Sequence, residues 1–331
     1  MSVDCTGDRS GTAPIDSAAV SLFDPASPVH PVRMRELTDP ALPSVPRANT
    51  GWINGFIGML IFSGSLPATR VAVLQFDPLF LTLARAAIAG LLACAMLAIG
   101  RERRPTRADL AALAIVAAGV VIAFPLLTAL ALRHVTAVHG IVFLGLLPLS
   151  TALFAVLRAG ERPTSAFWIF SFSGAALVCA YAIVHGGPGT MVADGLMLAA
   201  VLACGLGYAE GGSLSRRLGG WQVICWALVL SMPLTVPLAW LRMPAAWDGI
   251  GAPAWIGLGY VSVFSMLVGF VFWYRGLAQG GVAAVGQLQL LQPFVGLLLA
   301  AGLLHEAVGP DLPIVLVGVI ACVAAAKRFA R

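Results

Sequence analysis

Ten apolar runs, each long enough to cross a lipid bilayer, dominate the sequence from Trp52 onward. A bilayer core about 30 Å thick needs about 20 apolar residues per helix. The runs cover residues 52–74, 78–100, 109–132, 137–157, 165–185, 193–215, 221–241, 253–275, 282–304 and 311–326. They lack the alternating pattern of a membrane β-barrel, and a backbone in lipid must satisfy its own hydrogen bonds. The sequence therefore predicts an all-α integral membrane protein with ten transmembrane helices.

The composition agrees with a lipid-exposed surface and argues against a nucleic-acid partner. Apolar residues make up 59% of the chain and charged residues 11%, with a mean hydropathy of +0.92. A soluble domain carries about 25% charged residues. The net charge of +5 comes from short basic clusters between the runs, and the six cysteines show no metal-ligand or disulfide spacing. We expect no cofactor, no metal and no nucleic acid.

The first fifty residues differ from the rest of the chain. They are polar, contain seven prolines and hold no apolar stretch of signal-peptide length. We expect a disordered cytoplasmic tail over 1–50, with Met34 as an alternative start. A first five-helix repeat should follow over 51–187 and a second over 188–328.

Basic residues set the expected orientation. With the N-terminus inside, sixteen basic residues fall on the inner segments, and only Arg70, Arg133 and Arg242 fall on the outer side. Cytoplasmic loops of membrane proteins carry such an excess of Arg and Lys. The sequence therefore predicts a multi-pass protein of the bacterial cytoplasmic (inner) membrane with both termini in the cytoplasm.

One short pattern occurs twice. In LPLSTALFAVLRAGERP, Pro148 is followed thirteen residues later by Glu161, and in QPFVGLLLAAGLLHEAV, Pro293 is followed thirteen residues later by Glu306. The offset is 145 residues in both cases. Five helices per repeat give the two copies opposite directions, as in the inverted repeats of secondary transporters. Each glutamate ends its run, so we expect it to pair with a basic group or to cap the next helix.

The charges beside the two copies differ as inversion requires. Arg158 and Arg162 stand beside Glu161, where the loop should be cytoplasmic, whereas no Arg or Lys occurs between Arg275 and Lys327. The pattern is kept in the second copy and its positive charge is absent. The sequence thus predicts two inverted five-helix repeats.

Three segments resemble the drug/metabolite transporter superfamily and, within it, the EamA-type ten-helix exporters. They are RAAIAGLLA from Arg85, LLPLSTALFAVLRAGERP from Leu146, and WYRGLAQGGVAAVGQLQLLQPFVGLLLAAGLLHE from Trp273. The resemblance covers residues 50–328 and says little about the substrate. Many members carry Glu-Pro where this chain has Gln292-Pro293, so a proton-coupling role does not carry over to that position.

We expect a secondary transporter that exports small metabolites, such as amino acids or related compounds, by alternating access. The chain has no GxxxxGK[ST] motif for ATP, so an ion gradient, with protons as a candidate, or the substrate gradient would supply the energy. The transporter would be a monomer or a homodimer. The alternatives are a membrane-embedded enzyme acting on a lipid substrate, and a channel. The apolar runs contain no HExxH motif, no GxSxG motif and no paired aspartates, which a membrane-embedded enzyme would need. They also lack the continuous polar stripe that would line a channel. We therefore assign no catalytic residue and do not expect an enzyme.

Four polar residues within the runs are candidates for substrate binding, because polar groups in lipid are costly and need a role. Glu210 could bind a substrate amine or take up a proton, or it could pair with an arginine such as Arg275. Arg85 could face a substrate carboxylate, or it could be structural. Gln289 and Gln292 share one face of the ninth helix, where they could bind a polar substrate or join helices.

The remaining candidates are aromatic, histidine and proline residues. Tyr208 and Trp273 could line the substrate cavity or belong to an interfacial belt. His139 could act in a gate, although an interfacial position also explains it. Pro148 and Pro293 occupy matching depths in the two repeats, where they could act as hinges or give static curvature.

Overall fold

The computed structural model describes residues 48–102, 104–185, 190–304 and 312–330. Most of the predicted tail, with Met34, and also Glu306 fall outside these residues. Every described residue belongs to one compact unit, Pro46–Arg331. Within the described residues every secondary-structure element is a helix, so the all-α class is confirmed.

The helices of the first half cover the first five predicted runs with small shifts at their ends. Their bounds are α1 (Ala48–Ser63), α2 (Ser65–Val73), α3 (Pro78–Ile99), α4 (Arg107–Val116), η1 (Ala117–Ala123), α5 (Phe124–Ala131), α6 (Ala137–Leu144), α7 (Leu147–Ala159) and α8 (Ser165–His185).

The helices of the second half cover the other five runs. Their bounds are α9 (Met191–Leu218), α10 (Gly220–Leu241), α11 (Ala252–Gly259), η2 (Tyr260–Val268), α12 (Gly269–Gly280), α13 (Val282–Gly286), η3 (Gln287–Leu290), α14 (Gln292–Leu304) and α15 (Leu312–Phe329).

Among the described residues, seven helical stretches are long and apolar enough to cross a membrane. They are Asn49–Val73, Pro78–Ile99, Arg107–Ala131, Met191–Leu218, Gly220–Leu241, Ala252–Gly280 and Val282–Leu299. Two shorter apolar helices, Leu147–Ala159 and Ser165–Tyr181, cover further predicted runs. The chain is therefore a multi-pass membrane protein.

Local sequence signals explain where several helices begin and end. The Asp77 carboxylate accepts hydrogen bonds from the backbone N–H groups of Leu79 (3.0 Å) and Phe80 (3.1 Å), and Pro78 occupies the first turn of α3. Helix α7 ends at Gly160, whose φ of 68° lies in the left-handed region that favours glycine. Caps therefore fix helix ends here as they do in soluble proteins.

Five of the predicted runs are not regular α-helices throughout. The first run is divided by a one-residue turn at Gly64, between α1 and α2. The third and eighth runs contain the π-helical segments η1 and η2. The fourth run is broken by a turn between α6 and α7, and the ninth passes through the 3₁₀ segment η3 between α13 and α14. Breaks of this kind are often found at functional sites, because they free backbone groups and redirect side chains.

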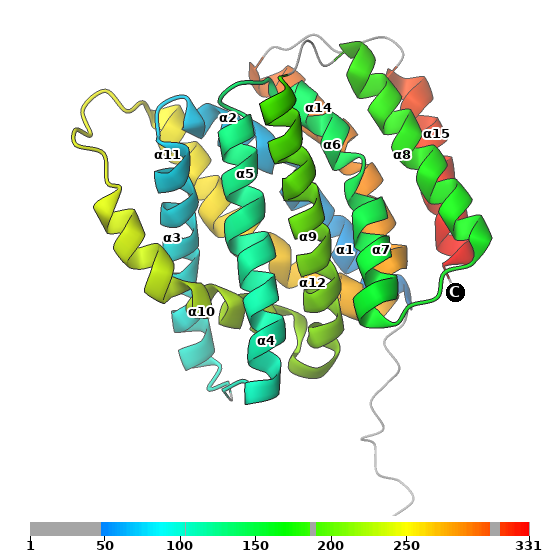
Figure 1. Cartoon of the computed structure of the whole chain (residues 1–331), viewed down its shortest axis with the longest axis horizontal. Helices are drawn as coiled ribbons and strands as arrows, with labels where there is room; N and C mark the ends of the chain where they lie inside the picture. Colours follow the sequence, from blue (N-terminus) through cyan, green and yellow to red (C-terminus); the bar gives the residue numbers. More distant parts are fainter. Residues whose placement is uncertain (1–47, 103, 186–189, 305–311, 331) are drawn as a thin grey trace, which may run out of the picture. The chain divides into compact units, whose positions relative to one another are not determined.

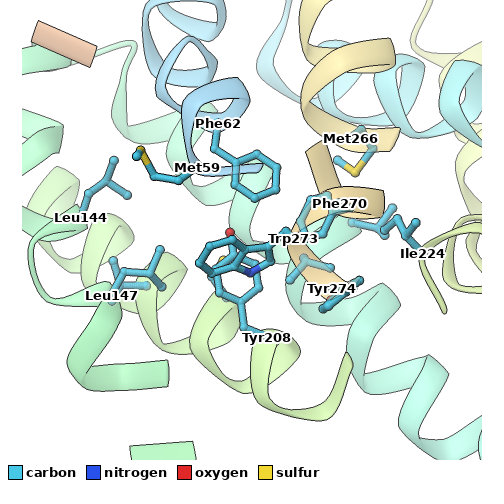
Figure 2. Packing of buried hydrophobic residues seen from close by; sticks show 14 of the residues in the cluster. Met59, Phe62, Leu144, Leu147, Tyr208, Ile224, Met266, Phe270, Trp273 and Tyr274 are labelled. Atoms are coloured by element: carbon cyan, nitrogen blue, oxygen red, sulfur yellow. The ribbon is translucent and has the colours of Figure 1, made fainter. Parts of the chain in front are cut away.

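The inner helices pack closely around a core rich in aromatic side chains. Helix α1 packs on α12, α3 on α10, and both α5 and α7 on α9, while α8 and α15 pack on each other to one side (Figure 1). The rings of Phe62, Tyr208, Phe270 and Trp273 meet in the core (Figure 2). Large apolar side chains also cover the outside, as lipid exposure requires; Ile53 is 60% exposed.

Candidate substrate site and gates

A small cavity lies where helices from both halves meet. Its volume is about 30 Å³, which is room for about one water molecule. Apolar lining comes from residues such as Phe62, Phe124, Leu147 and Phe270. The polar lining consists of Ser65, Thr69, Arg85, Thr128, Tyr208, Ser265 and Gln292. Three of the predicted site residues, Arg85, Tyr208 and Gln292, are therefore brought together.

Arg85 places a guanidinium group in this cavity. The residue is 6% exposed, and its Nη2 donates to the Ser265 hydroxyl at 3.2 Å. That hydroxyl also shares a 2.7 Å hydrogen bond with the Ser65 hydroxyl. Among the described residues, the Nε atom of Arg85 has no hydrogen-bond partner and no acidic residue forms an ion pair with Arg85. A buried charge without a counterion costs several kcal/mol, so the cavity is suited to an anionic group.

Tyr208 and Gln292 form another part of the cavity wall. The Gln292 amide Nε2 donates to the Phe62 carbonyl at 3.4 Å, which is a weak hydrogen bond that a ligand could replace. The Tyr208 ring lies 6.5 Å from the Phe62 ring and 5.3 Å from the Trp273 ring, measured between centroids (Figure 2). Trp273 is fully buried beneath this wall and does not line the cavity. Neither Tyr208 nor Trp273 lies in an exposed interfacial belt.

Gln289 does not line the cavity, and the run that it shares with Gln292 is not a regular α-helix throughout. Gln289 lies in the 3₁₀ segment η3, and α14 starts again at Gln292. The residue is 1% exposed, and its amide lies beside the Tyr208 side chain without a well-formed hydrogen bond to any described residue. Gln287 is also buried, and neither of its amide atoms has a hydrogen-bond partner among the described residues. Buried amides left without partners are uncommon and often mark functional positions.

Glu210 lies outside the cavity and pairs with an arginine other than the one expected. Its carboxylate accepts a hydrogen bond from Arg158 Nε of α7, not from Arg275. Glu210 is 8% exposed, whereas Arg158 reaches outward and is half exposed. Arg275 was only an example of a basic partner, and the packing of α7 on α9 determines which arginine is close.

Two further ion pairs occur near Glu210. Glu161, just after α7, binds Arg216 at 2.7 Å and accepts hydrogen bonds from the backbone N–H groups of Val282 (2.7 Å) and Ala283 (2.8 Å). Glu161 thus both pairs with a basic group, as expected, and caps a helix. The capped helix is α13 of the other half, not the next helix along the chain. Asp109 of α4 and Arg217 of α9 form a second pair at 2.7 Å.

His139 lies away from the cavity, at the start of α6. Its Nε2 atom is 2.6 Å from an Asp194 carboxylate oxygen at the start of α9. Nearby, the Arg70 guanidinium donates to the Leu132 carbonyl. These contacts join α2, α5, α6 and α9.

The prolines that mark the repeat each follow a helix break. Pro148 is the second residue of α7, after the turn that ends α6, and Pro293 is the second residue of α14, after η3. Proline is favourable in the first turn, because its missing N–H has no partner within the helix there. Neither proline therefore kinks the interior of a helix.

The cavity also uses residues that sequence reasoning missed. Ser65, Thr69, Thr128 and Ser265 supply hydroxyl groups to its wall. Hydroxyl residues are common inside membrane helices, so their presence in apolar runs gave no usable signal. No group of three or more potential metal ligands occurs in the described part of the chain.

Comparison with known proteins identifies the family. The sequence matches the EamA-like transporter family over residues 49–182 and 191–326. The chain is 65% identical over 285 residues to the uncharacterized transporter YdeK of Bacillus subtilis, with 86% of this chain and 99% of the relative covered. It is 29% identical over 264 residues to a probable terminal-alkyne amino-acid exporter of Streptantibioticus cattleyicolor, with 78% of this chain and 86% of the relative covered.

A solved crystal structure has a similar fold. It superposes with a TM-score of 0.67 at 21% identity, over 86% of this chain and 98% of the other. At that identity the likeness concerns the fold alone. The family match and the relatives' names agree with a transporter and give no sign of an enzyme. The chain is a member of the EamA-like transporter family, within the drug/metabolite transporter superfamily.

Proposed function

We propose that this protein is a secondary transporter of the bacterial inner membrane that exports small metabolites bearing a carboxylate, such as amino acids, by alternating access. The observation that carries the proposal is Arg85. Its guanidinium lies in a small cavity between helices of both halves and lacks a carboxylate partner among the described residues. A substrate carboxylate would supply the missing charge and hydrogen bonds.

The rest of the cavity suits a small polar molecule with an apolar portion. Ser65, Thr69, Thr128 and Gln292 offer hydrogen bonds to an amine or hydroxyl, and Tyr208 and Phe270 offer apolar surface. A volume of about 30 Å³ is smaller than an amino acid needs, so the cavity must widen to bind one. The amino-acid exporter among the relatives supports this class of substrate.

Ten membrane-spanning segments in two inverted repeats account for the helical breaks. In each half the third run contains a π-helical segment, and the fourth run is interrupted just before its proline. Two unrelated halves would have no reason to carry helical breaks at matching places. A duplicated five-helix unit would carry the same breaks in both copies. On this view Pro148 and Pro293 stand at hinge points.

The orientation follows from where the charged segments lie. The α3–α4 loop, the α7–α8 loop, the α9–α10 turn and the end of α15 lie at one end of the helices (Figure 1). These segments carry most of the described basic residues, including Arg104, Arg162, Arg217 and Lys327. We assign this end to the cytoplasm.

Two sets of contacts would then act as alternating gates. The ion pairs of Glu161, Glu210 and Asp109 hold helix ends together at the cytoplasmic end. The His139–Asp194 contact and the Arg70–Leu132 contact hold helices at the outer end. Alternating access requires one set to open while the other stays closed. Glu210 and His139 are the candidates for taking up a coupling proton.

The test is export of toxic amino-acid analogues. Cells that express the protein should tolerate at least one analogue better than cells without it, and the Arg85→Gln variant should lose that tolerance while it is still made and inserted. Arg242→Gln is the matched control, because Arg242 is an exposed arginine outside the cavity. Equal tolerance with Arg85→Gln and wild type would remove Arg85 from substrate binding.

A further inference from the structure

A second, larger cavity lies apart from the proposed substrate site. Its volume is about 760 Å³, and it lies where the start of α1, the α7–α8 loop, the α12–α13 turn and the end of α15 meet. We call it the terminal pocket. Its lining includes Trp52, Arg162, Ala324, Lys327 and Arg328. It shares no lining residue with the smaller cavity.

Positive charge dominates the terminal pocket. Arg162, Lys327 and Arg328 are exposed, and none of them forms an ion pair with a described acidic residue. Glu161 is the one acidic residue of the described lining, and it is already bound to Arg216 and to two backbone N–H groups. Three cations around one hollow form a site for a phosphate group.

Two apolar stripes lead from the pocket along the outside of the protein. On α1, the pocket residues Asn49 and Trp52 continue along one helical face to the exposed side chains of Ile53, Phe56 and Leu60. On α15, the pocket residues Ala324, Lys327 and Arg328 continue in the same way to the exposed Val317 and Ile320. A soluble phosphate compound has no apolar chains that could contact these stripes, whereas the acyl chains of a lipid could pack against them.

We propose that the terminal pocket binds the phosphate headgroup of an anionic phospholipid, with the acyl chains lying on the stripes of α1 and α15. The Lys327 ammonium lies 4.4 Å from the centroid of the Trp52 ring, so the two stripes meet at the pocket. Anionic lipids are concentrated in the cytoplasmic leaflet, and basic pockets between helix ends bind their headgroups. The choice of leaflet rests on the orientation proposed above, but the site does not depend on the exported substrate.

The experiment measures lipid binding to the purified full-length protein. Native mass spectrometry would count bound phosphatidylglycerol and phosphatidylcholine of the same acyl composition, and thermal unfolding in detergent would report stabilisation by each lipid and by inorganic phosphate. The test variant is Arg162→Gln/Lys327→Gln/Arg328→Gln. The control variant, Arg101→Gln/Arg104→Gln/Arg107→Gln, removes three exposed basic residues outside the pocket.

The wild type should bind phosphatidylglycerol in preference to phosphatidylcholine and unfold at a higher temperature with it. The test variant should bind phosphatidylglycerol about 100-fold more weakly, since each basic residue near the surface contributes about 1 kcal/mol. The control variant should bind like the wild type. Equal losses in both variants, or no preference between the lipids, would overturn the proposal. Equal stabilisation by inorganic phosphate would assign the pocket to a soluble anion and also overturn it.

Discussion

Glu161 offers the sharpest perturbation of the proposed cytoplasmic gate. Its carboxylate joins the end of α7 to the start of α13 through Val282 N–H and Ala283 N–H, and it binds Arg216 of α9. The Glu161→Ala substitution removes all three interactions together and leaves the apolar packing in place. We expect the variant to populate the state that is open to the cytoplasm more than the wild type does.

The size of the effect follows from the strength of these three interactions. A helix N-cap contributes about 1 kcal/mol, and the charge near the helix N-terminus about 0.5 kcal/mol. The pair with Arg216, whose side chain is 42% exposed, contributes about 0.5 kcal/mol after solvent screening. If these interactions exist only in the closed state, the substitution lowers the free energy of the open state relative to the closed state by about 2 kcal/mol. This raises the ratio of open to closed molecules by a factor of about 30.

Alkylation of Cys204 measures that population. Cys204 is buried and lies one turn from Tyr208 on α9, so a maleimide reaches it only when the bundle opens. In a variant with Cys204 as its sole cysteine, Glu161→Ala should speed labelling about 30-fold. Asp248→Ala, which removes an exposed carboxylate elsewhere, should leave the rate unchanged. Labelling of Glu161→Ala at the wild-type rate, with a lowered unfolding temperature, would refute the gate and leave Glu161 a structural cap.

Three further predictions concern the packing and polar groups of the core. Gly205→Ala should destabilise the protein by about 1–3 kcal/mol, because its new Cβ would overlap the Ser150 hydroxyl and lie 2.8 Å from Ser150 Cβ. The control is Gly195→Ala on the same helix, whose new Cβ meets nothing within 4 Å; it should be neutral or stabilising in thermal unfolding. Gln289→Met should raise the unfolding temperature because it removes a buried amide that has no well-formed hydrogen bond to a described residue; unchanged export would then show that this amide does not serve the substrate. Arg158→Gln should destabilise the protein by about 1–2 kcal/mol by leaving a buried carboxylate unpaired, and Glu210→Gln should reverse much of that loss in a double-mutant cycle. Export by Glu210→Gln that matches the wild type at every pH would exclude Glu210 from proton coupling.

The helices were predictable because the membrane permits few alternatives. The described residues of the ten apolar runs are helical except for short turns within or at the ends of several runs, as at Gly64 and Leu291, and α3, α8 and α10 have nearly the predicted bounds. The breaks were harder to see. Nothing in AAGVVIA or YVSVFSMLV, the sequences of η1 and η2, distinguishes a π-helix from an α-helix.

Some residues of the candidate site could likewise be identified from the sequence and others could not. Arg85, Tyr208 and Gln292 stood out as polar groups inside apolar runs, and they share one cavity wall. Gln289 stood out for the same reason, but it lies outside that wall because η3 changes the helical register. The serine and threonine hydroxyls beside Arg85 gave no signal of their own.

By itself the sequence determined the class of protein, the helical runs and the family. The length of an apolar run and the cost of placing a charge in lipid can be read from each segment alone, whichever helices it packs against. Tertiary structure decided which charges meet. Glu210 found Arg158 rather than Arg275, and Glu161 found the start of α13, across 121 residues of sequence. Such contacts depend on which helix faces pack together, and many faces of this chain are equally apolar. Only the packed arrangement could leave the Arg85 guanidinium without an acidic partner among the described residues and so reveal what the cavity is suited to bind.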